Sequence, residues 1–509
     1  MDKSGNLNRK TCLLLSTIFL ILLASCSWAQ DAGSQQPAAA TPSEEQSKPS
    51  QPKTPDTENH AAAKTANTTT ESKISPKEAA DLFREVSQIL QFASDDSGLP
   101  IKHQVKPKLA GRDEVVAYLE KSMAEDKDAK RLRRSELVLK KFGLLPPDFD
   151  LSKFLVALLR EQIAGYYDPK KKTVNLLDWV DVAAQRPVLA HELTHALQDQ
   201  SFNLDKWMRK GDVDLDTKKN PNARDVQNDE TPEARQAVAE GQAMVVLVDN
   251  MLLPTGQSLL SSPEVAKALE DGMLAGTPDS VQFQSAPIYL REALTFPYRY
   301  GLEFEAQLLK QGGRQEAFFG ALKNPPYTTR QIMEPKTYLA GERIAPLALP
   351  DFKNIFKNYD RFDIGAIGEF DVAVLIDQYA GTEASHNLYP HWRGGYYYAA
   401  RPKGDANAAL GLLYVSRWSD ADKAGEFAAI YAEYLPKRYL HVQPAASDAA
   451  KPVVDHEESK HLIGTHTWLT ESGPVVIEVK GDTVLITESL DQATTEGLEQ
   501  DVFGVSSAR

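Results

Sequence analysis

The chain has 509 residues and a formal net charge of −14, and 42% of its residues are hydrophobic, which is enough to build a sizeable core. The acidic balance and the lack of a basic, aromatic-laced segment exclude a nucleic-acid-binding protein. Cys12 and Cys26 are its two cysteines, so neither a disulfide framework nor a cysteine-based metal site is expected.

Residues 1–26 have the pattern of an export signal. Arg9 and Lys10 precede an apolar run that is shorter than a membrane span. The run ends in Leu-Ala-Ser-Cys26, which resembles a bacterial lipobox and predicts lipidation of Cys26. Ordinary signal cleavage after Ala29 is the alternative. We therefore expect an exported cell-envelope protein, held to the membrane by a lipid anchor.

Residues 27–74 are predicted to form a disordered tether. They are rich in Gln, Ser, Thr, Pro, Ala and Lys, with almost no large apolar side chain, so they cannot bury enough surface to fold. Helical periodicity begins at Ser75, and residues 75–150 are interpreted as a helical N-terminal region. Further helices are predicted over 112–125, 129–142 and 151–164.

Residues 165–178 predict a β-hairpin. Tyr166 and Tyr167 lie in the first strand, a turn containing Pro169 follows, and residues 173–177 form the return strand. The hairpin comes shortly before the helix that carries the main motif of the chain.

His191, Glu192 and His195 form an H-E-x-x-H motif inside an apolar helical segment, 188–197. Four residues turn a helix by about 40° beyond one full turn, so both imidazoles leave the same face and can bind one metal ion. Glu192 points about 100° away from His191 and can reach a metal-bound water. The pattern favours catalytic zinc with Glu192 as general base. A pair of satisfied core histidines is the alternative.

The third metal ligand is expected on the helix that begins at Thr231, the predicted N-cap. Glu233 lies in its first turn, where the helix dipole favours an acid. Glu240 lies in an apolar run, where an unpaired carboxylate is costly, and Gly241 beside it lets another backbone approach closely. Glu240 is therefore the predicted ligand. Glu233 is the fallback, on the same helix face two turns earlier.

These residues resemble the gluzincin, or thermolysin-like, branch of zinc metallopeptidases. A narrower likeness, to a set of poorly characterised secreted bacterial proteins, spans roughly residues 80 to 440. It rests on four segments: 165–169, 191–200, 296–301 and 325–331. The resemblance implies zinc held by His191, His195 and Glu240, with Glu192 as base. It also implies that the strand before the metal helix binds extended peptide as an added strand.

Two departures from the family pattern stand out. Met244 takes the place of an acid that orients a histidine in thermolysin-like enzymes, so Asp199 or Asp249 is expected in that role. Arg330 and Glu334 stand where the narrower group has Glu and His. Neither departure touches the predicted metal ligands.

Peptide hydrolysis also needs a hydrogen-bond donor opposite the metal. Tyr298 and Tyr300, in a helix predicted over 288–311, and Tyr327 are the candidates for this oxyanion or substrate contact. A packing role is the alternative for each of them.

Residues 345–509 predict a C-terminal α+β domain. Its predicted helices are 362–379 and 421–434, and its predicted strands are 392–398, 410–418, 465–469, 475–479 and 483–487. Gly481 and Asp482 form the last turn of this meander. The scattered histidines, from His386 to His466, are not expected to form a second metal site.

The predicted fold class is α+β, with a predominantly helical zincin-like metallopeptidase domain and small edge sheet over 151–344, followed by the C-terminal domain. The predicted function is an exported zinc-dependent peptidase that acts on a peptide or protein substrate. The first alternative, favoured by the two departures, is a zinc-stapled binding or assembly lipoprotein of the cell envelope that hydrolyses nothing. The second is an envelope scaffold without metal.

Overall fold

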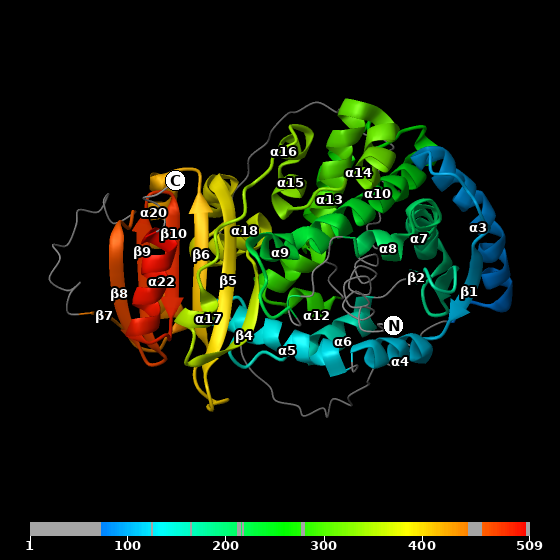
Figure 1. Ribbon diagram of the computed structural model, residues 1–509. Coiled ribbons are helices and arrows are strands. Elements are labelled where there is room, and N and C mark those ends of the chain that lie inside the picture. Colours follow the sequence, from blue (N-terminus) through cyan, green and yellow to red (C-terminus); the bar gives the residue numbers. More distant parts are fainter. Residues whose placement is uncertain are drawn as a thin grey trace, which may run out of the picture.

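The computed structural model describes residues 73–123, 126–162, 165–210, 215, 218–275, 280–445 and 461–504. The predicted signal, Cys26 and nearly all of the predicted tether lie outside these residues. Figure 1 shows a helical part, from α3 to α16, beside a part built on an antiparallel sheet, from β4 to α22. The predicted α+β class is confirmed at this level.

Helix α3 (Pro76–Ser97) begins where the sequence predicts. The Ser75 hydroxyl accepts a hydrogen bond from the Glu78 N–H at 3.2 Å, and the Glu78 carboxylate accepts one from the Ser75 N–H at 2.7 Å. Gly98 ends the helix in the left-handed region. The other helices before the hairpin are α4 (Arg112–Met123), α5 (Asp126–Lys141) and α6 (Leu151–Gln162).

The small sheet has the strand order β1-β3-β2. Strands β2 (Gly165–Asp168) and β3 (Thr173–Leu177) form the predicted antiparallel hairpin. Strand β1 (Lys106–Ala110), which pairs with β3 in parallel, falls in a region predicted to be helical. Its sequence carries two lysines and a proline, and only Ala110 is buried, so no apolar alternation identifies it. Because β3 lies in the middle of this sheet, β2 is an edge strand, and it packs beside α7.

The centre of the helical part consists of α7 (Val182–Phe202), α10 (Thr231–Leu252) and α13 (Ile288–Arg314), and α10 packs against both neighbours. Helices α10 and α13 cross where Gly241 meets Gly301. A Cβ atom on Gly241 would lie 2.2 Å from the carbonyl oxygen of Gly301. Glycine at this crossing lets the two backbones touch, as expected for Gly241.

The segment between α7 and α10 contains α8 (Leu204–Met208), α9 (Ala223–Gln227) and the 3₁₀ turn η1 (Asn228–Glu230). Because η1 runs directly into α10, Thr231 has helical φ and ψ angles of −60° and −39°. Its hydroxyl donates to the carbonyl of Tyr327 at 3.2 Å. The prediction of Thr231 as an N-cap is therefore wrong.

Shorter elements complete the helical part. They are η2 (Leu253–Thr255), α11 (Pro263–Ala275), α12 (Val281–Gln284), the π-helical turn η3 (Gln315–Gly320), α14 (Ala321–Lys323), α15 (Thr329–Met333) and α16 (Pro335–Leu339). One hydrophobic core joins residues from Leu82 on α3 to Val374 on α18, so the predicted regions 75–150 and 151–344 share it. Among the described residues, no helix is both long and apolar enough to cross a membrane.

The large sheet is antiparallel, with the order β4-β5-β6-β10-β9-β8-β7. Its strands are β4 (Tyr359–Ala366), β5 (Trp392–Pro402), β6 (Gly411–Trp418), β7 (Val442–Pro444), β8 (Gly464–Thr470), β9 (Gly473–Lys480) and β10 (Thr483–Glu488). Helices α18 (Glu369–Ala380) and α20 (Ala421–Arg438) cover one face, and α17 (Phe352–Ile355) and α22 (Gln492–Gly504) cover the other. The elements α19 (Thr382–Leu388) and η4 (Tyr389–His391) precede β5.

The predicted helix over 362–379 is wrong in its first third. Strand β4 continues to Ala366, and α18 begins only at Glu369, where the Gly368 N–H donates to Asp371 at 2.9 Å. Ile364 packs in the core under α17, whereas Val372 packs in the core on the opposite face of the sheet. The apolar residues of the two elements follow each other so closely that they read as one helical pattern.

Candidate metal centre

Helices α7 and α10 pack side by side and bring the predicted ligands together. His191 Nε2 lies 3.1 Å from His195 Nε2, and Glu240 Oε2 lies 3.1 Å from the first and 3.3 Å from the second. All three side chains are buried. Within the described part of the chain, they are the one group of histidine, cysteine and acidic residues placed to hold a metal ion.

The spacing of the three donor atoms fits a tetrahedral metal site. Bonds of about 2.0–2.1 Å at tetrahedral angles place neighbouring donors about 3.3 Å apart. The two imidazole nitrogens and the Glu240 oxygen form a triangle with sides of 3.1–3.3 Å. Nitrogen and carboxylate donors of this kind suit zinc, with a fourth position left for water.

Buried charges hold the three donors together. Burial and His195 lower the pKa of His191 to about 4 against the pull of Glu240. Burial also disfavours the charged form of His195, but Glu240 raises the pKa of His195 to about 9. Although burial opposes its ionisation, the two histidines lower the pKa of Glu240 to about 2. The cluster therefore pairs a carboxylate with one protonated imidazole, and a metal cation would take the place of that proton.

Glu192 lies next to the cluster without joining it. Its carboxylate accepts a hydrogen bond from the backbone N–H of Tyr167, on β2, at 2.7 Å. Burial, opposed in part by His195, raises the pKa of Glu192 to about 7. The edge strand of the predicted hairpin, β2, thus binds the carboxylate of the predicted base, Glu192.

Neither Asp199 nor Asp249 orients a histidine, so that expectation is wrong. Asp199 accepts from the Tyr167 hydroxyl at 2.9 Å and from the Leu204 N–H at 3.1 Å. Asp249 accepts from the Leu259 N–H, 2.5 Å away. The contact to His195 comes from an amide instead, because Gln198 Oε1 lies 2.9 Å from Nδ1.

The structure places one of the three candidate tyrosines beside the ligands. The ring of Tyr298 stacks on His191, with centroids 6.2 Å apart and planes inclined by 29°. Burial, followed by the charges of Glu240 and Glu192, raises the pKa of Tyr298 well above its ordinary value. Tyr300 packs against Phe296 with the two rings tilted by 41°, and the Tyr327 hydroxyl donates to the Glu342 carbonyl at 3.2 Å.

Glu233, Arg330 and Glu334 lie away from the cluster of His191, His195 and Glu240. Burial and the carboxylates of Asp371 and Glu230 raise the pKa of Glu233 well above its ordinary value. Arg330 and Glu334, the two residues that depart from the narrower group's pattern, form an ion pair at 3.0 Å. Arg330 also lies 2.6 Å from Glu369 on α18, so the three residues form an ion-pair cluster between the helical part and α18.

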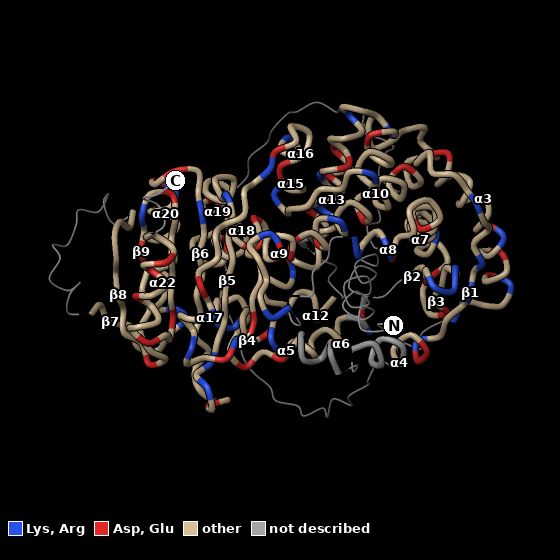
Figure 2. The backbone as a smooth tube through the Cα atoms, in the orientation of Figure 1, with Lys and Arg blue, Asp and Glu red and all other residues tan. Residues whose placement is uncertain are grey.

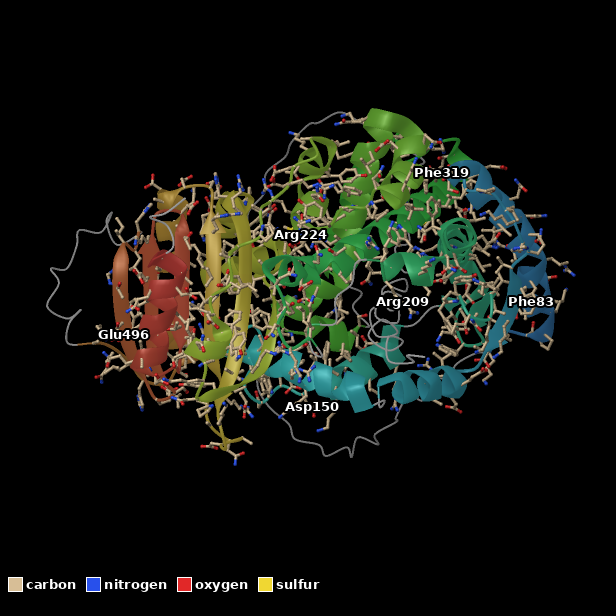
Figure 3. All side chains as sticks on the ribbon, in the orientation of Figure 1. Phe83, Asp150, Arg209, Arg224, Phe319 and Glu496 are labelled. Atoms are coloured by element: carbon tan, nitrogen blue, oxygen red, sulfur yellow. The ribbon has the colours of Figure 1, made fainter. Side chains whose placement is uncertain are left out.

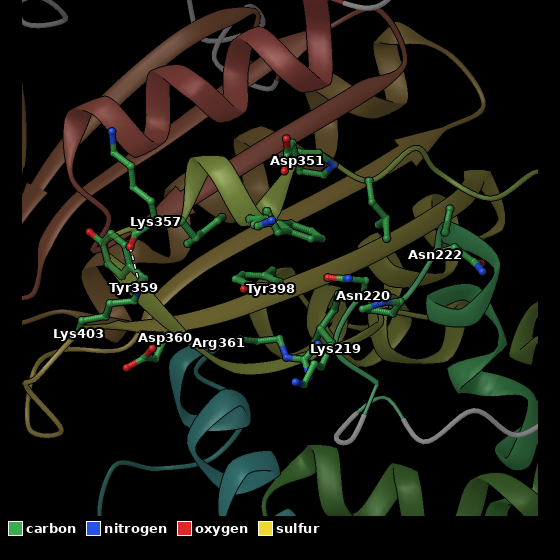
Figure 4. A pocket seen from close by; sticks show the side chains of 18 residues that line it. Lys219, Asn220, Asn222, Asp351, Lys357, Tyr359, Asp360, Arg361, Tyr398 and Lys403 are labelled. Carbon is green, nitrogen blue, oxygen red and sulfur yellow. Dashed lines mark hydrogen bonds between the residues drawn. The ribbon is translucent and has the colours of Figure 1, made fainter.

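Acidic and basic residues are interspersed along the described residues of both parts (Figure 2), and their side chains are drawn in Figure 3. A cavity of about 600 Å³ opens between residues 219–223 and the end of the large sheet. Lys219, Arg361 and Tyr398 line it (Figure 4). None of the metal-cluster residues belongs to its wall.

Comparison with known proteins bears on the sheet part alone. A family model described as a domain of unknown function (DUF8575) matches residues 359–499, from β4 to α22. The match does not include α7 or α10. No curated protein and no solved structure matches the chain.

Proposed function

We propose that this protein is a zinc-dependent peptidase of the cell envelope, exported and lipid-anchored through Cys26. The observation that carries the proposal is the donor triangle of His191, His195 and Glu240, with sides of 3.1–3.3 Å, beside a second, separately held carboxylate. A three-ligand set leaves a position for water, whereas structural zinc sites close with four protein ligands. Zinc at this position would polarise the scissile carbonyl and lower the pKa of bound water.

Glu192 has the properties of the base. Its contact with the Tyr167 N–H fixes one carboxylate oxygen and leaves the other to take a proton from water. The pKa of about 7 that burial gives Glu192 suits a group that accepts a proton and then returns it to the leaving amine. Tyr298, beside His191, is the donor best placed to stabilise the oxyanion.

The edge strand β2 supplies a place for substrate. The outer side of β2, which no other described strand covers, is where an extended peptide would add as a further strand. Three of the four β2 residues are buried and the Tyr167 N–H is bound to Glu192, so the added strand would use the remaining backbone groups of β2. Because β2 also holds Glu192 through Tyr167, substrate binding and alignment of the base would involve the same strand. We therefore propose an unfolded or extended peptide segment as the substrate class.

One observation favours the alternative of a zinc-stapled assembly protein that hydrolyses nothing. The side chains of His191, Glu192, His195 and Glu240 are almost completely buried, and even the most exposed residue, His195, has only 8% of its surface accessible to solvent. Such burial is typical of a closed structural site. The alternative requires that zinc stabilise the fold and that no peptide be cleaved in its presence.

The substitution Glu192→Gln separates the two functions. It removes the base and keeps every ligand, so the full-length variant should retain about one zinc per chain and lose at least about 100-fold in casein or peptide-library cleavage. Glu233→Gln, the same chemical change two turns from Glu240, is the control and should cleave normally. Wild-type protein that binds zinc but cleaves nothing would support the alternative. Loss of zinc from Glu192→Gln would show that Glu192 is structural.

A further inference from the structure

We infer that Gln198 and Gln242 are positioning residues that hold the neutral, metal-binding form of His195 in a single tautomer, with its proton on Nδ1 and its lone pair on Nε2. The inference rests on the metal site of the proposed function. It starts from a row of buried amides that leads away from His195 through the core of the helical part. Both glutamines are fully buried.

The orientation of the first amide is forced by its neighbours. Gln198 Nε2 lies 3.0 Å from the carbonyl of Ala239 and 2.9 Å from Gln242 Oε1. Both partners are acceptors, so this end of the carboxamide must be the donor NH₂ group. The oxygen of Gln198 must then face His195 Nδ1, 2.9 Å away. A carboxamide oxygen accepts only, so His195 must carry its proton on Nδ1.

The second amide is fixed in the same way. Gln242 Nε2 donates to the carbonyl of Ala317 at 2.8 Å and lies 3.4 Å from that of Phe318. These carbonyls belong to the π-helical turn η3, a distortion often found next to functional sites. Because the NH₂ group of Gln242 faces η3, its oxygen must face Gln198. The direction of every hydrogen bond in the row is thus set by the backbone of η3 and α10.

The two predicted metal ligands differ in this respect. His191 Nδ1 is buried and has no hydrogen-bond partner among the described residues, and its ring stacks on Tyr298. His195 alone is held by a directional row of hydrogen bonds. Removal of the row should therefore change the tautomer of His195 and leave His191 as it is. Partners of this kind commonly change metal affinity by 10–100-fold.

The experiment compares full-length wild type, Gln198→Leu and Gln242→Leu. In the metal-free proteins at about pH 10.5, above the pKa of about 9 at which His195 loses its second proton, two-bond ¹H–¹⁵N correlation spectra report which ring nitrogen of His195 carries the remaining proton. Competition with a chromophoric chelator gives the zinc dissociation constant. We expect one tautomer in wild type and a mixture in Gln198→Leu, whose zinc affinity falls about 10–100-fold. Gln242→Leu should weaken zinc binding by less than about 10-fold, since Ala239 still orients Gln198.

Two further variants distinguish positioning from packing. Gln198→Glu keeps an acceptor at His195 Nδ1 and should restore the single tautomer that Gln198→Leu loses. Gln200→Leu lies on the same helix, but its amide bonds to the backbone of Lys102 and His103, so both readouts should remain at wild-type values.

The inference is overturned if Gln198→Leu, or Gln198→Met where the first variant does not fold, keeps both the tautomer and the zinc affinity of wild type. It is also overturned if wild type carries the proton on Nε2. Failure of the proposed function gives a different result, because a wild type that binds no zinc still reports the His195 tautomer.

Discussion

The helical part and the sheet part each bury a carboxylate at their centre, and they neutralise it in different ways. Glu488, on β10, contacts Arg438 through both oxygens at 2.7 and 2.8 Å and accepts from the Tyr431 hydroxyl at 2.6 Å. Lys141, on α5, adds a second cation at 3.4 Å. Glu240, on α10, has as its ion-pair partners among the described residues only the imidazoles of the H-E-x-x-H motif.

The charge of Glu488 is neutralised within the protein, whereas neutralisation of the charge of Glu240 depends on the protonation of a histidine or on a bound cation. Arginine stays protonated, so the pairing of Glu488 with Arg438 is complete within the protein. Imidazole is neutral at and above neutral pH unless a neighbouring charge holds its proton. Glu240 therefore requires either a proton on His195 or a bound cation. Burial of such a set is costly unless a ligand supplies the charge, which favours a metal-binding role.

The largest effect is expected from Glu240→Ala. It removes one of three donors, so zinc affinity at pH 7 should fall by at least about 1,000-fold, or about 4 kcal/mol. A chelator should lower the midpoint of thermal unfolding of wild type and leave that of Glu240→Ala unchanged. Isothermal titration and calorimetry with and without chelator measure both effects. Wild-type zinc affinity in Glu240→Ala would show that the third ligand is another residue.

The substitution Arg438→Met is expected to lower the unfolding free energy without changing zinc affinity. The substitution leaves Glu488 buried without its closest cation, which should cost about 3–5 kcal/mol of unfolding free energy. Urea denaturation followed by circular dichroism measures this cost. The control is Arg417→Met, on β6, which pairs with the strand of Glu488. Its side chain is partly exposed, so the expected cost is below about 1 kcal/mol. A shift in zinc affinity in Arg438→Met would mean that the two clusters are coupled.

Acid should weaken the sheet cluster in a defined pH window. Burial opposes ionisation, yet Arg438 and Lys141 lower the pKa of Glu488 to about 2, from an ordinary value of 4.5. A lowered carboxyl pKa stabilises the fold above pH 4.5, and this contribution is lost as the pH falls towards 2. The loss amounts to about 3 kcal/mol. Urea denaturation between pH 6 and pH 2 should show a steeper decline in wild type than in Glu488→Gln.

A smaller effect is expected where α10 crosses α13. In Gly241→Ala the new methyl group would meet the Gly301 carbonyl, so the helices must separate, at a cost of about 1–3 kcal/mol. Gly272→Ala, on α11 with no atom within 4 Å of the new Cβ, is the control and should stabilise the helix by about 0.5–1 kcal/mol. Thermal unfolding of the chelated proteins compares them. Equal midpoints for the two variants would mean that the crossing yields without cost.

Sequence reasoning reached the residues whose role is local. The four-residue spacing of His191 and His195 places them on one helix face, and an acid in an apolar run identified Glu240. The capping box of α3 and the hairpin before α7 are also local patterns. In these cases a few neighbouring residues determine the geometry.

Features that depend on distant partners were missed. Strand β1 exists because β3 lies beside it, since little in its own sequence favours a strand. Gln198 contacts His195 within one turn, but its orientation depends on Gln242 and on η3. Tyr298 lies beside His191 because of the way α13 packs, whereas Tyr300 lies on the same helix and packs against Phe296. Neither periodicity nor a motif carries that information.

A third carboxyl, the half-buried Glu233, completes the comparison, because no cation pairs with it among the described residues. Burial and the carboxylates of Asp371 and Glu230 raise its pKa well above the ordinary value of 4.5, so the folded protein holds its proton more tightly than the unfolded chain does. Stability from this group is therefore lost as the pH rises above 4.5. Glu233→Gln keeps the shape and removes the charge, and should raise the unfolding free energy at pH 8 while leaving it almost unchanged at pH 4. Its zinc affinity should equal that of wild type, since Glu240 lies about 10 Å further along α10. Urea denaturation at the two pH values, with a zinc titration at pH 7, tests both statements. Loss of zinc in this variant would move the third ligand from Glu240 to Glu233.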